Sequence, residues 1–244
     1  RAVEKITVFS PVLPDEYDMV KSSHKWRYFP KFASWNYGTM EDNLIKGFEG
    51  EVVTGNAILV GNSATYTGNH AEALDLLHKL GVDDREVVAP LSYGDPQLAK
   101  ELTSLGQEYF SDNFEPLMDF MPVQEYVAII KKCGYVIMNH VRQQAVGNIV
   151  IMLYLGARVF VRQENPVYDF FKNSGVVIST VQELEGQPEL LNLPLTAQER
   201  ASNRAIVSDY WGRERAYERT RKLVEAAFSA KGVKSPALIA ETYQ

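Results

Sequence analysis

The feature that most limits the fold of this chain is a regular alternation of short apolar runs with amphipathic segments. The apolar runs lie at residues 57–60, 86–90, 135–139, 158–161 and 176–179. They are continuous rather than alternating, which is typical of strands buried on both faces of a parallel sheet. Segments with the helical period of 3.6 residues separate them. We therefore predict an α/β fold, with a Rossmann-like, doubly wound parallel sheet over residues 55–185.

Cap signals mark the ends of the predicted helices between these strands. Asn69 and Glu72 have the spacing of a capping box at one helix start. Gly106 is expected to end the next helix, because glycine favours helix termini. Asn148 is expected to cap the very apolar helix that follows it. These signals place the loops in which a site should be sought.

The chain on either side of this range is predicted to form two further parts. Before it, a strand at 5–10 and a helix near 15–21 are followed by an aromatic, irregular stretch. After it, residues 186–244 are predicted to form a helical tail. Thr196 and Glu199 have capping-box spacing near its start.

Composition excludes several classes of function. The formal net charge is −6, so the chain has no overall basic field, and nucleic acid is not an expected partner. The single cysteine, Cys133, excludes a disulfide framework and a cysteine-rich zinc site. The histidines lack metal-ligand spacing and no Asp-x-Asp sequence is present, so no metal is expected. No apolar run approaches the ~20 residues that span a bilayer.

Polar residues at the strand ends are the candidates for a site, because doubly wound sheets bind ligands beyond the carboxyl ends of their strands. The first such loop contains Gly61, Asn62 and Ser63. Glycine allows a ligand to approach the backbone closely, and the two side chains offer hydrogen bonds. Neither the dinucleotide fingerprint nor the P-loop sequence is present. A polar turn without a ligand is the alternative.

The second loop lies between a buried strand and an apolar helix. Arg142 can grip a phosphate with two hydrogen bonds, and Gly147 with Asn148 would place free amides at the helix start. Gln143 and Gln144 add two long polar side chains that packing does not explain. The alternative is a structural pair between Arg142 and a carboxylate, beside solvated glutamines.

The third loop contains Glu164 and Asn165 before Pro166, again between a strand and a helix. The Glu164 carboxylate can accept hydrogen bonds from two hydroxyls of a ribose or a sugar. In the alternative, Glu164 or Asn165 only caps the helix that Pro166 begins. The sequence of this loop alone leaves both interpretations open.

Taken together, these loops resemble a known enzyme family. The matching segments are 58–63 with 69–74, then 142–147 and 162–166, preceded by Tyr28-Phe29-Pro30. In this order and spacing they resemble the 4-alpha-L-fucosyltransferase family. Its members are the TDP-Fuc4NAc:lipid II Fuc4NAc transferases of enterobacterial common antigen synthesis, where Fuc4NAc is 4-acetamido-4,6-dideoxygalactose. The loop at 64–69 and the tail at 210–213 depart from the family pattern.

The resemblance implies the C-terminal, donor-binding half of a GT-B glycosyltransferase, a fold of two Rossmann-like domains facing across a cleft. Residues 1–54 would be the end of the N-terminal acceptor domain plus the linker. Most of that domain would precede this chain, and the missing initiator methionine agrees. The implied donor is a dTDP-sugar, with no further cofactor, and the implied acceptor is a lipid-diphosphate-linked saccharide. Such an enzyme would contact the inner membrane peripherally, at its cytoplasmic face.

The resemblance also implies roles for the loop residues. Arg142 would be catalytic by stabilising the leaving nucleoside diphosphate, and Glu164 by contacting the ribose or the donor sugar. The remaining donor contacts would come from Gly61, Asn62, Ser63, Gln143, Gln144, Gly147, Asn148 and Asn165. A sugar-nucleotide-binding module without catalysis and a GT-B-type sugar-nucleotide epimerase are the alternatives.

Overall fold

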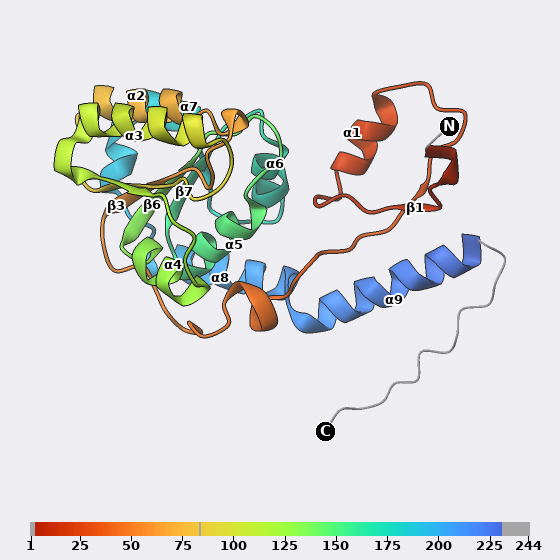
Figure 1. Cartoon of the computed structure of the whole chain (residues 1–244). Helices are drawn as coiled ribbons and strands as arrows, with labels where there is room; N and C mark the ends of the chain where they lie inside the picture. The colour runs from red at the N-terminus through yellow and green to blue at the C-terminus, as the bar shows by residue number, and fades with distance from the viewer. Residues whose placement is uncertain (1–2, 83, 231–244) are drawn as a thin grey trace. The chain divides into compact units, whose positions relative to one another are not determined.

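A six-stranded sheet forms the centre of the longer part of the chain (Figure 1). Its strands are β3 (Ala57–Val60), β4 (Val87–Pro90), β5 (Phe114–Leu117), β6 (Cys133–Met138), β7 (Arg158–Val161) and β8 (Ser179–Thr180). Their order across the sheet is β5-β4-β3-β6-β7-β8, and every neighbouring pair is parallel. The predicted α/β, doubly wound parallel sheet is thereby confirmed.

The structure, a computed structural model, describes residues 3–82 and 84–230. It divides into two compact units. Residues 44–208 form the first, which we call the sheet unit and which contains the predicted range 55–185. The second, which we call the terminal unit, consists of the described residues before 44 and after 208.

Helices cover both faces of the sheet, as the parallel strands require. They are α2 (His70–Lys79), α3 (Pro96–Phe110), α4 (Val123–Ile130), α5 (Val146–Leu155), α6 (Pro166–Asn173), α7 (Val181–Gly186) and α8 (Ala197–Tyr210). In Figure 1, α2, α3 and α7 lie over one face and α4, α5 and α8 over the other. Short 3-10 turns follow several elements, namely η3 (Tyr66–Gly68), η4 (Ser111–Asn113) and η5 (Pro188–Asn192).

Apolar burial holds the sheet unit together. The side chains of β3, β4 and β6 are all buried, and α5 is buried around nearly its whole circumference. Each fully buried aliphatic side chain contributes roughly 1.5–3 kcal/mol relative to exposure. The strands and α5 are therefore the least movable parts of the unit, and the loops that leave them start from fixed points.

Two predicted helix caps are wrong, and tertiary contacts explain both. Asn69 has a left-handed backbone with φ of 49°, and its side chain donates to the backbone oxygen of Asn139 instead of capping α2. Asn148 lies inside the first turn of α5, which begins earlier, after Ala145. The capping box of Thr196 and Glu199 is confirmed, because each side chain accepts from the backbone N–H of the other.

The terminal unit has its own small elements. They are η1 (Val3–Lys5), β1 (Val8–Phe9), α1 (Glu16–Ser22), β2 (Lys31–Phe32), the π-helical turn η2 (Met40–Leu44) and α9 (Arg213–Ala230). Strands β1 and β2 pair in parallel. The backbone N–H of Met40 donates to the oxygen of Trp211 at 2.9 Å, and Arg213 forms an ion pair with Asp42 at 2.6 Å. These contacts tie the early segment to the end of the described chain. Within the described residues, no helix is long and apolar enough to cross a membrane.

The prediction that Gly106 ends its helix is wrong, because α3 continues to Phe110. A Cβ atom at position 106 would lie 2.4 Å from the ring of Phe114. We expect Gly106→Ala to lower the free energy of unfolding by about 1–3 kcal/mol, although alanine is the better helix former. Gly186→Ala is the matched control, because nothing lies within 4 Å of its added Cβ. Urea unfolding of both variants tests this, and equal stability of the two would contradict it.

Candidate active site

The candidate site lies at the carboxyl ends of β3 and β6. From β3 the chain crosses to β4 on one side, and from β6 it crosses to β7 on the other. The two loops therefore diverge and leave a crevice between them, which is where doubly wound folds bind ligands. The first and second predicted loops face each other across it.

Asn62 joins the two loops. Its side-chain oxygen accepts from Nε2 of His140 at 3.1 Å and from the Gln144 amide at 3.2 Å. Because an amide oxygen only accepts, this contact places the His140 proton on Nε2. The Asn62 amide nitrogen donates in turn to the hydroxyl of Tyr93 at 3.2 Å. The structure thus brings together Asn62 and Gln144, which belong to the first and second predicted loops, and adds His140 and Tyr93 to them.

Two buried histidines lie beneath the crevice. Burial lowers the pKa of His70 to about 4. Burial, helped by the nearby His70 and Arg142, lowers the pKa of His140 to about 4. Both rings are therefore neutral near pH 7. His70 has no hydrogen-bond partner at either ring nitrogen, so its ring acts as a packing element.

The His70 ring fills the space where a side chain at position 61 would lie. A Cβ atom on Gly61 would be 2.0 Å from Nε2 of His70, and one on Gly68 would be 2.4 Å from Cε1. Gly61 also has a φ of 68°, in the left-handed region that favours glycine. Close approach and backbone conformation both require glycine at this turn.

Arg142 is exposed at the edge of the crevice. Its guanidinium donates to the Thr67 hydroxyl and to the backbone oxygen of Gln143, both at 3.3 Å. The Thr67 hydroxyl donates to the Gln144 side chain at 2.8 Å. Within the described chain Arg142 forms no ion pair with a carboxylate, so the structural pair considered as an alternative is not seen there. Gln143 and Gln144 are half-buried beside it.

The start of α5 points its free amides toward this loop. Ala145 before it has φ of 60° and ψ of 20°, and no side chain caps the helix. The first backbone N–H groups of a helix have no partner within it, and the helix dipole makes this end positive. Gly147 and Asn148, two predicted site residues, belong to this first turn. Uncapped helix starts of this kind bind phosphate groups.

In the third loop, the two predicted residues differ in accessibility. Asn165 is fully buried, accepts from the N–H of Val167 as the cap of α6, and donates to the backbone oxygen of His140 at 2.9 Å. Its side chain is therefore already occupied within the protein. Glu164 is exposed and accepts from Gln182 at 2.9 Å. Hydrogen bonds from its own backbone and from Gln182 lower the pKa of Glu164.

A salt bridge connects the third loop to α2. Arg162 donates to both carboxylate oxygens of Glu72 at 2.8 Å, which raises the pKa of Arg162. Its Nε lies 3.5 Å from the carboxylate of Glu164. The Asn139 amide also donates to Glu72 at 3.2 Å. Glu72 therefore holds the side chains of Arg162 and Asn139 and does not cap α2 as predicted.

A cavity of about 260 Å³ adjoins the crevice over the ends of β4 and β5. Its lining includes Tyr93, Asp119, Phe120 and Tyr126, which sequence reasoning missed. Two predicted site residues, Asn62 and Asn148, also line it. The buried Tyr126 hydroxyl has no partner, and burial raises its pKa. The strand-end rule, applied to the loops after Pro90 and Leu117, would have found this cavity. Among the described residues no group of His, Cys, Asp and Glu could hold a metal ion.

The sheet unit has the fold of the GT-B glycosyltransferases. Solved structures of that class match the chain closely in fold. A glycosyltransferase from Rickettsia africae superposes with a TM-score of 0.65 at 12% identity, over 94% of this chain and 64% of its own length. HepE from Anabaena, in complex with UDP and glucose, gives a TM-score of 0.66 at 12% identity, and the match covers 93% of this chain and 64% of HepE. A UDP-forming trehalose-phosphate synthase from Burkholderia xenovorans gives a TM-score of 0.63 at 12% identity, and the match covers 91% of this chain and 61% of the synthase.

The sequence places the chain more narrowly. The chain belongs to the 4-alpha-L-fucosyltransferase family, glycosyl transferase group 56, whose family model matches residues 18–187. This confirms the resemblance inferred from the loop motifs. The chain spans less than two thirds of the length of these three solved structures.

We expect Gly61→Ala to be much more destabilising than Gly81→Ala. Both positions have φ of 68°, so both variants lose about 1–2 kcal/mol to the left-handed backbone. Only at position 61 does the new methyl group meet the His70 ring, which adds about 1–3 kcal/mol of overpacking. Chemical unfolding measures both, and a Gly81→Ala variant as unstable as Gly61→Ala would contradict the packing argument.

The two buried histidines predict a pH dependence of stability. Their folded pKa of about 4 lies below the ordinary value of 6.5, so the unfolded chain binds more protons between these values. The contribution of these histidines to the free energy of unfolding is therefore fully present above pH 6.5 and is lost as the pH falls toward 4. Unfolding curves collected across this range should show the loss, and His70→Gln or His140→Gln should weaken the slope. A slope unchanged in both variants would contradict it.

Proposed function

We propose that this chain is the nucleotide-sugar-binding half of a glycosyltransferase that moves a Fuc4NAc-like deoxyamino sugar from a dTDP-sugar to a lipid-diphosphate-linked saccharide. The observation that carries the proposal is the uncapped start of α5 beside Arg142, at the switch point of the sheet. Family membership supports glycosyl transfer. The donor sugar, the base and the acceptor are the parts that experiment must establish.

In this proposal the donor diphosphate binds at the α5 start. The amides of the first turn, which includes Gly147 and Asn148, donate to its oxygens, and the helix dipole adds positive charge. Arg142 is exposed and free of a carboxylate partner among the described residues, so its guanidinium can reach a phosphate without breaking an ion pair. Gly61 gives the first loop its left-handed turn, and the His70 ring fills the space beside it.

The nucleoside would occupy the cavity over β4 and β5. Tyr93 and Phe120 expose aromatic surface there, which can stack on a pyrimidine ring. The unpartnered Tyr126 hydroxyl can donate to a base carbonyl, which would satisfy its buried hydrogen-bonding group. Asn148 lines the cavity and also belongs to the first turn of α5, so base and diphosphate sites adjoin.

The donor sugar would lie between the second and third loops. The exposed Glu164 carboxylate keeps acceptor capacity for sugar hydroxyls beyond its bond from Gln182. Gln143 contributes a half-buried amide, while the Gln144 amide holds Asn62 and Thr65 in place. In the transfer step the acceptor oxygen bonds to the anomeric carbon as the bond from that carbon to the diphosphate oxygen breaks. Arg142 and α5 stabilise the negative charge that develops on the leaving dTDP.

The acceptor of the proposed reaction carries a lipid diphosphate, so the enzyme would work at the cytoplasmic face of the inner membrane as a peripheral protein. The resemblance of the loop motifs to the Fuc4NAc transferases is the reason for this part of the proposal. A binding module without catalysis would bind the donor and transfer nothing. An epimerase would convert the donor sugar without an acceptor.

Titration calorimetry of the chain with dTDP, UDP and GDP tests the donor site. We expect selective binding of dTDP that weakens by about 10- to 100-fold in Arg142→Ala, as expected for the loss of a charge-assisted hydrogen bond. Lys100→Ala, which removes an exposed cation of α3, is the control and should bind like the parent. Preference for UDP or GDP would contradict the dTDP assignment. If Lys100→Ala lost affinity for dTDP and Arg142→Ala kept it, the proposed role of Arg142 would be contradicted.

Product analysis with a dTDP-sugar and a lipid-linked acceptor then separates the alternatives. Saccharide extended on the lipid supports transfer. An epimerised donor, or donor that is bound and unchanged in the complete enzyme, would contradict it.

A further inference from the structure

A cavity of about 380 Å³ lies in the sheet unit at the edge opposite to the candidate active site, and we call it the amino-edge cavity. Its lining includes Gly55 and Asn56, which precede β3, and Gly134 and Tyr135 near the start of β6. Because β3 and β6 are parallel, their amino ends share this edge and their carboxyl ends share the crevice. The sheet therefore separates the amino-edge cavity from the crevice in which the donor would bind.

The amino-edge cavity contains a buried cation without a counter-charge. Arg85, which lies just before β4, is only 8% exposed and lines the cavity. Among the described residues it forms no ion pair, and its Nε and Nη2 donate to the backbone oxygen of Asn56 while Nη1 donates to that of Leu191 at 2.8 Å. Burial lowers the pKa of Arg85, and Tyr135 and Asp84 offset this only in part. Buried charges are normally paired with an opposite charge, because an unpaired one is costly.

Arg85 keeps hydrogen-bond donors for such a partner. A guanidinium carries five N–H groups, and three of those of Arg85 are used, so one remains on each terminal nitrogen. The Tyr135 ring centre lies 4.6 Å from the guanidinium carbon and supports its plane. Two donors in one plane match two oxygens of a phosphate group.

Arg200 of α8 supplies a second cation to the lining. Its stem packs over Gly156, where an added Cβ would lie 2.8 Å from Cδ of Arg200. Arg200 has no side-chain hydrogen bond or ion pair within the described chain. No Asp or Glu of the described residues lines the cavity, so its formal charge is +2, from Arg85 and Arg200, in a chain with a formal charge of −6.

Neutral polar groups complete the lining. They are the amides of Asn56 and Asn192 and the hydroxyl of Thr54, and none of these side chains forms a hydrogen bond with another described residue. Amides and hydroxyls of this kind donate to and accept from the hydroxyls of a sugar. The volume of 380 Å³ lies within the range of about 300–1,000 Å³ that is typical of small-molecule sites. The cavity thus offers two arginines for an anionic group and amides for a polar, uncharged remainder.

We propose that the amino-edge cavity binds a sugar phosphate, with the phosphate between Arg85 and Arg200 and the sugar hydroxyls against Asn56 and Asn192. The ligand is bound without reaction, at a site apart from the crevice. Its phosphate gives the buried Arg85 the counter-charge that the described chain does not supply. Binding to the folded chain alone shifts the unfolding equilibrium, so the ligand should also stabilise the fold. The proposal does not depend on the donor or the acceptor of the proposed reaction.

Calorimetric titration and thermal unfolding with glucose 6-phosphate test the proposal. Both use the Arg142→Ala chain, in which the phosphate site proposed for the crevice is weakened. We expect glucose 6-phosphate to raise Tm and to bind at least tenfold more tightly than inorganic phosphate. Adding Arg200→Gln should weaken the binding by about 10- to 100-fold, as expected for the loss of a charge-assisted hydrogen bond.

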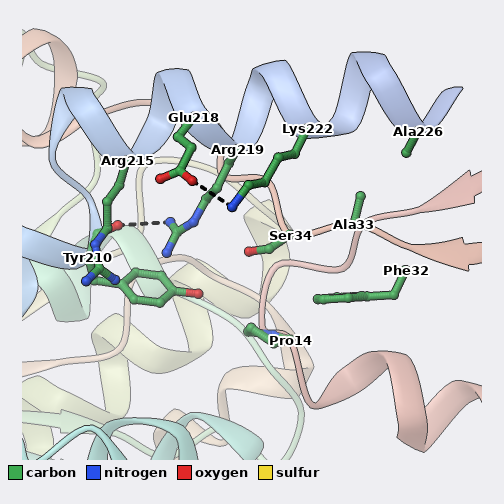
Figure 2. Close-up of a pocket in the computed structure, with 10 residues that line it drawn as sticks. All are labelled: Pro14, Phe32, Ala33, Ser34, Tyr210, Arg215, Glu218, Arg219, Lys222 and Ala226. Carbon is green, nitrogen blue, oxygen red and sulfur yellow. Dashed lines mark hydrogen bonds and ion pairs between the residues drawn. The ribbon is translucent and has the colours of Figure 1, made fainter. Parts of the chain in front are cut away.

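A variant of the terminal unit is the matched control. Lys222 also lines a cavity, where Figure 2 shows it beside Glu218, its ion-pair partner at 2.6 Å. Lys222→Gln removes one cation from that cavity, as Arg200→Gln does from the amino-edge cavity. It should leave the affinity for glucose 6-phosphate within about twofold of the parent.

Asn192→Asp tests the buried charge without removing an arginine. A carboxylate at this position should raise Tm in the absence of ligand and abolish the rise in Tm with glucose 6-phosphate, because it takes the place of the phosphate. Absence of glucose 6-phosphate binding would overturn the proposal, as would binding that Arg200→Gln leaves unchanged. Equal affinity for inorganic phosphate would overturn the sugar phosphate as the ligand. Titration of Arg200→Gln alone with dTDP tests the crevice separately, so a failure there would count against the proposed function only.

Discussion

The pairing of β3 with β6 is the constraint on which the rest of the structure depends. Its register sets Val60 opposite Ile137, so the loops after both strands leave the sheet at the same level. Because the chain then moves away in opposite directions, no helix connection fills the space between the loops. Asn62 and His140, which are 78 residues apart in sequence, meet there for this reason. The position of the crevice is thus a property of backbone topology, and side-chain chemistry only decides what it can bind.

Within the crevice, hydrogen bonds fix the polar groups before any ligand arrives. Tyr93, Asn62, Gln144, Thr67 and Arg142 form one continuous chain of side-chain contacts. Electrostatic stabilisation of a leaving group depends on dipoles that are already oriented, because reorienting them during the reaction would cost free energy. The neutral, buried histidines below contribute shape without adding charge next to the α5 start. Positive charge beside the crevice therefore comes from Arg142 and the start of α5, and the two histidines add none.

The sequence predicted the sheet well because buried parallel strands leave a strong signal, the continuous apolar run. It placed the first and second polar loops at strand ends, and the structure brings these loops together because β3 and β6 are neighbours in the sheet. The prediction failed where a side chain could cap a helix locally but forms a hydrogen bond or ion pair with a distant residue instead. Asn69 could cap α2, but Asn139 offers it a backbone oxygen; Glu72 could complete that cap, but Arg162 binds it from 90 positions away. The cavity at Phe120 was missed because Glu115 and Pro116 interrupt β5, which therefore lacks the continuous apolar run of the other strands.

The packing of the His70 ring between Gly61 and Gly68 also limits how such a chain can change in evolution. Neither glycine can be replaced freely while the His70 ring is kept. A larger residue fits at 68 only after the ring at 70 has been replaced by a smaller side chain, and a residue at 61 must in addition adopt the left-handed backbone, so the order of substitutions matters. Among natural sequences of this fold, the three positions should accordingly vary together, and a glycine lost at one of them should be accompanied by a lost histidine.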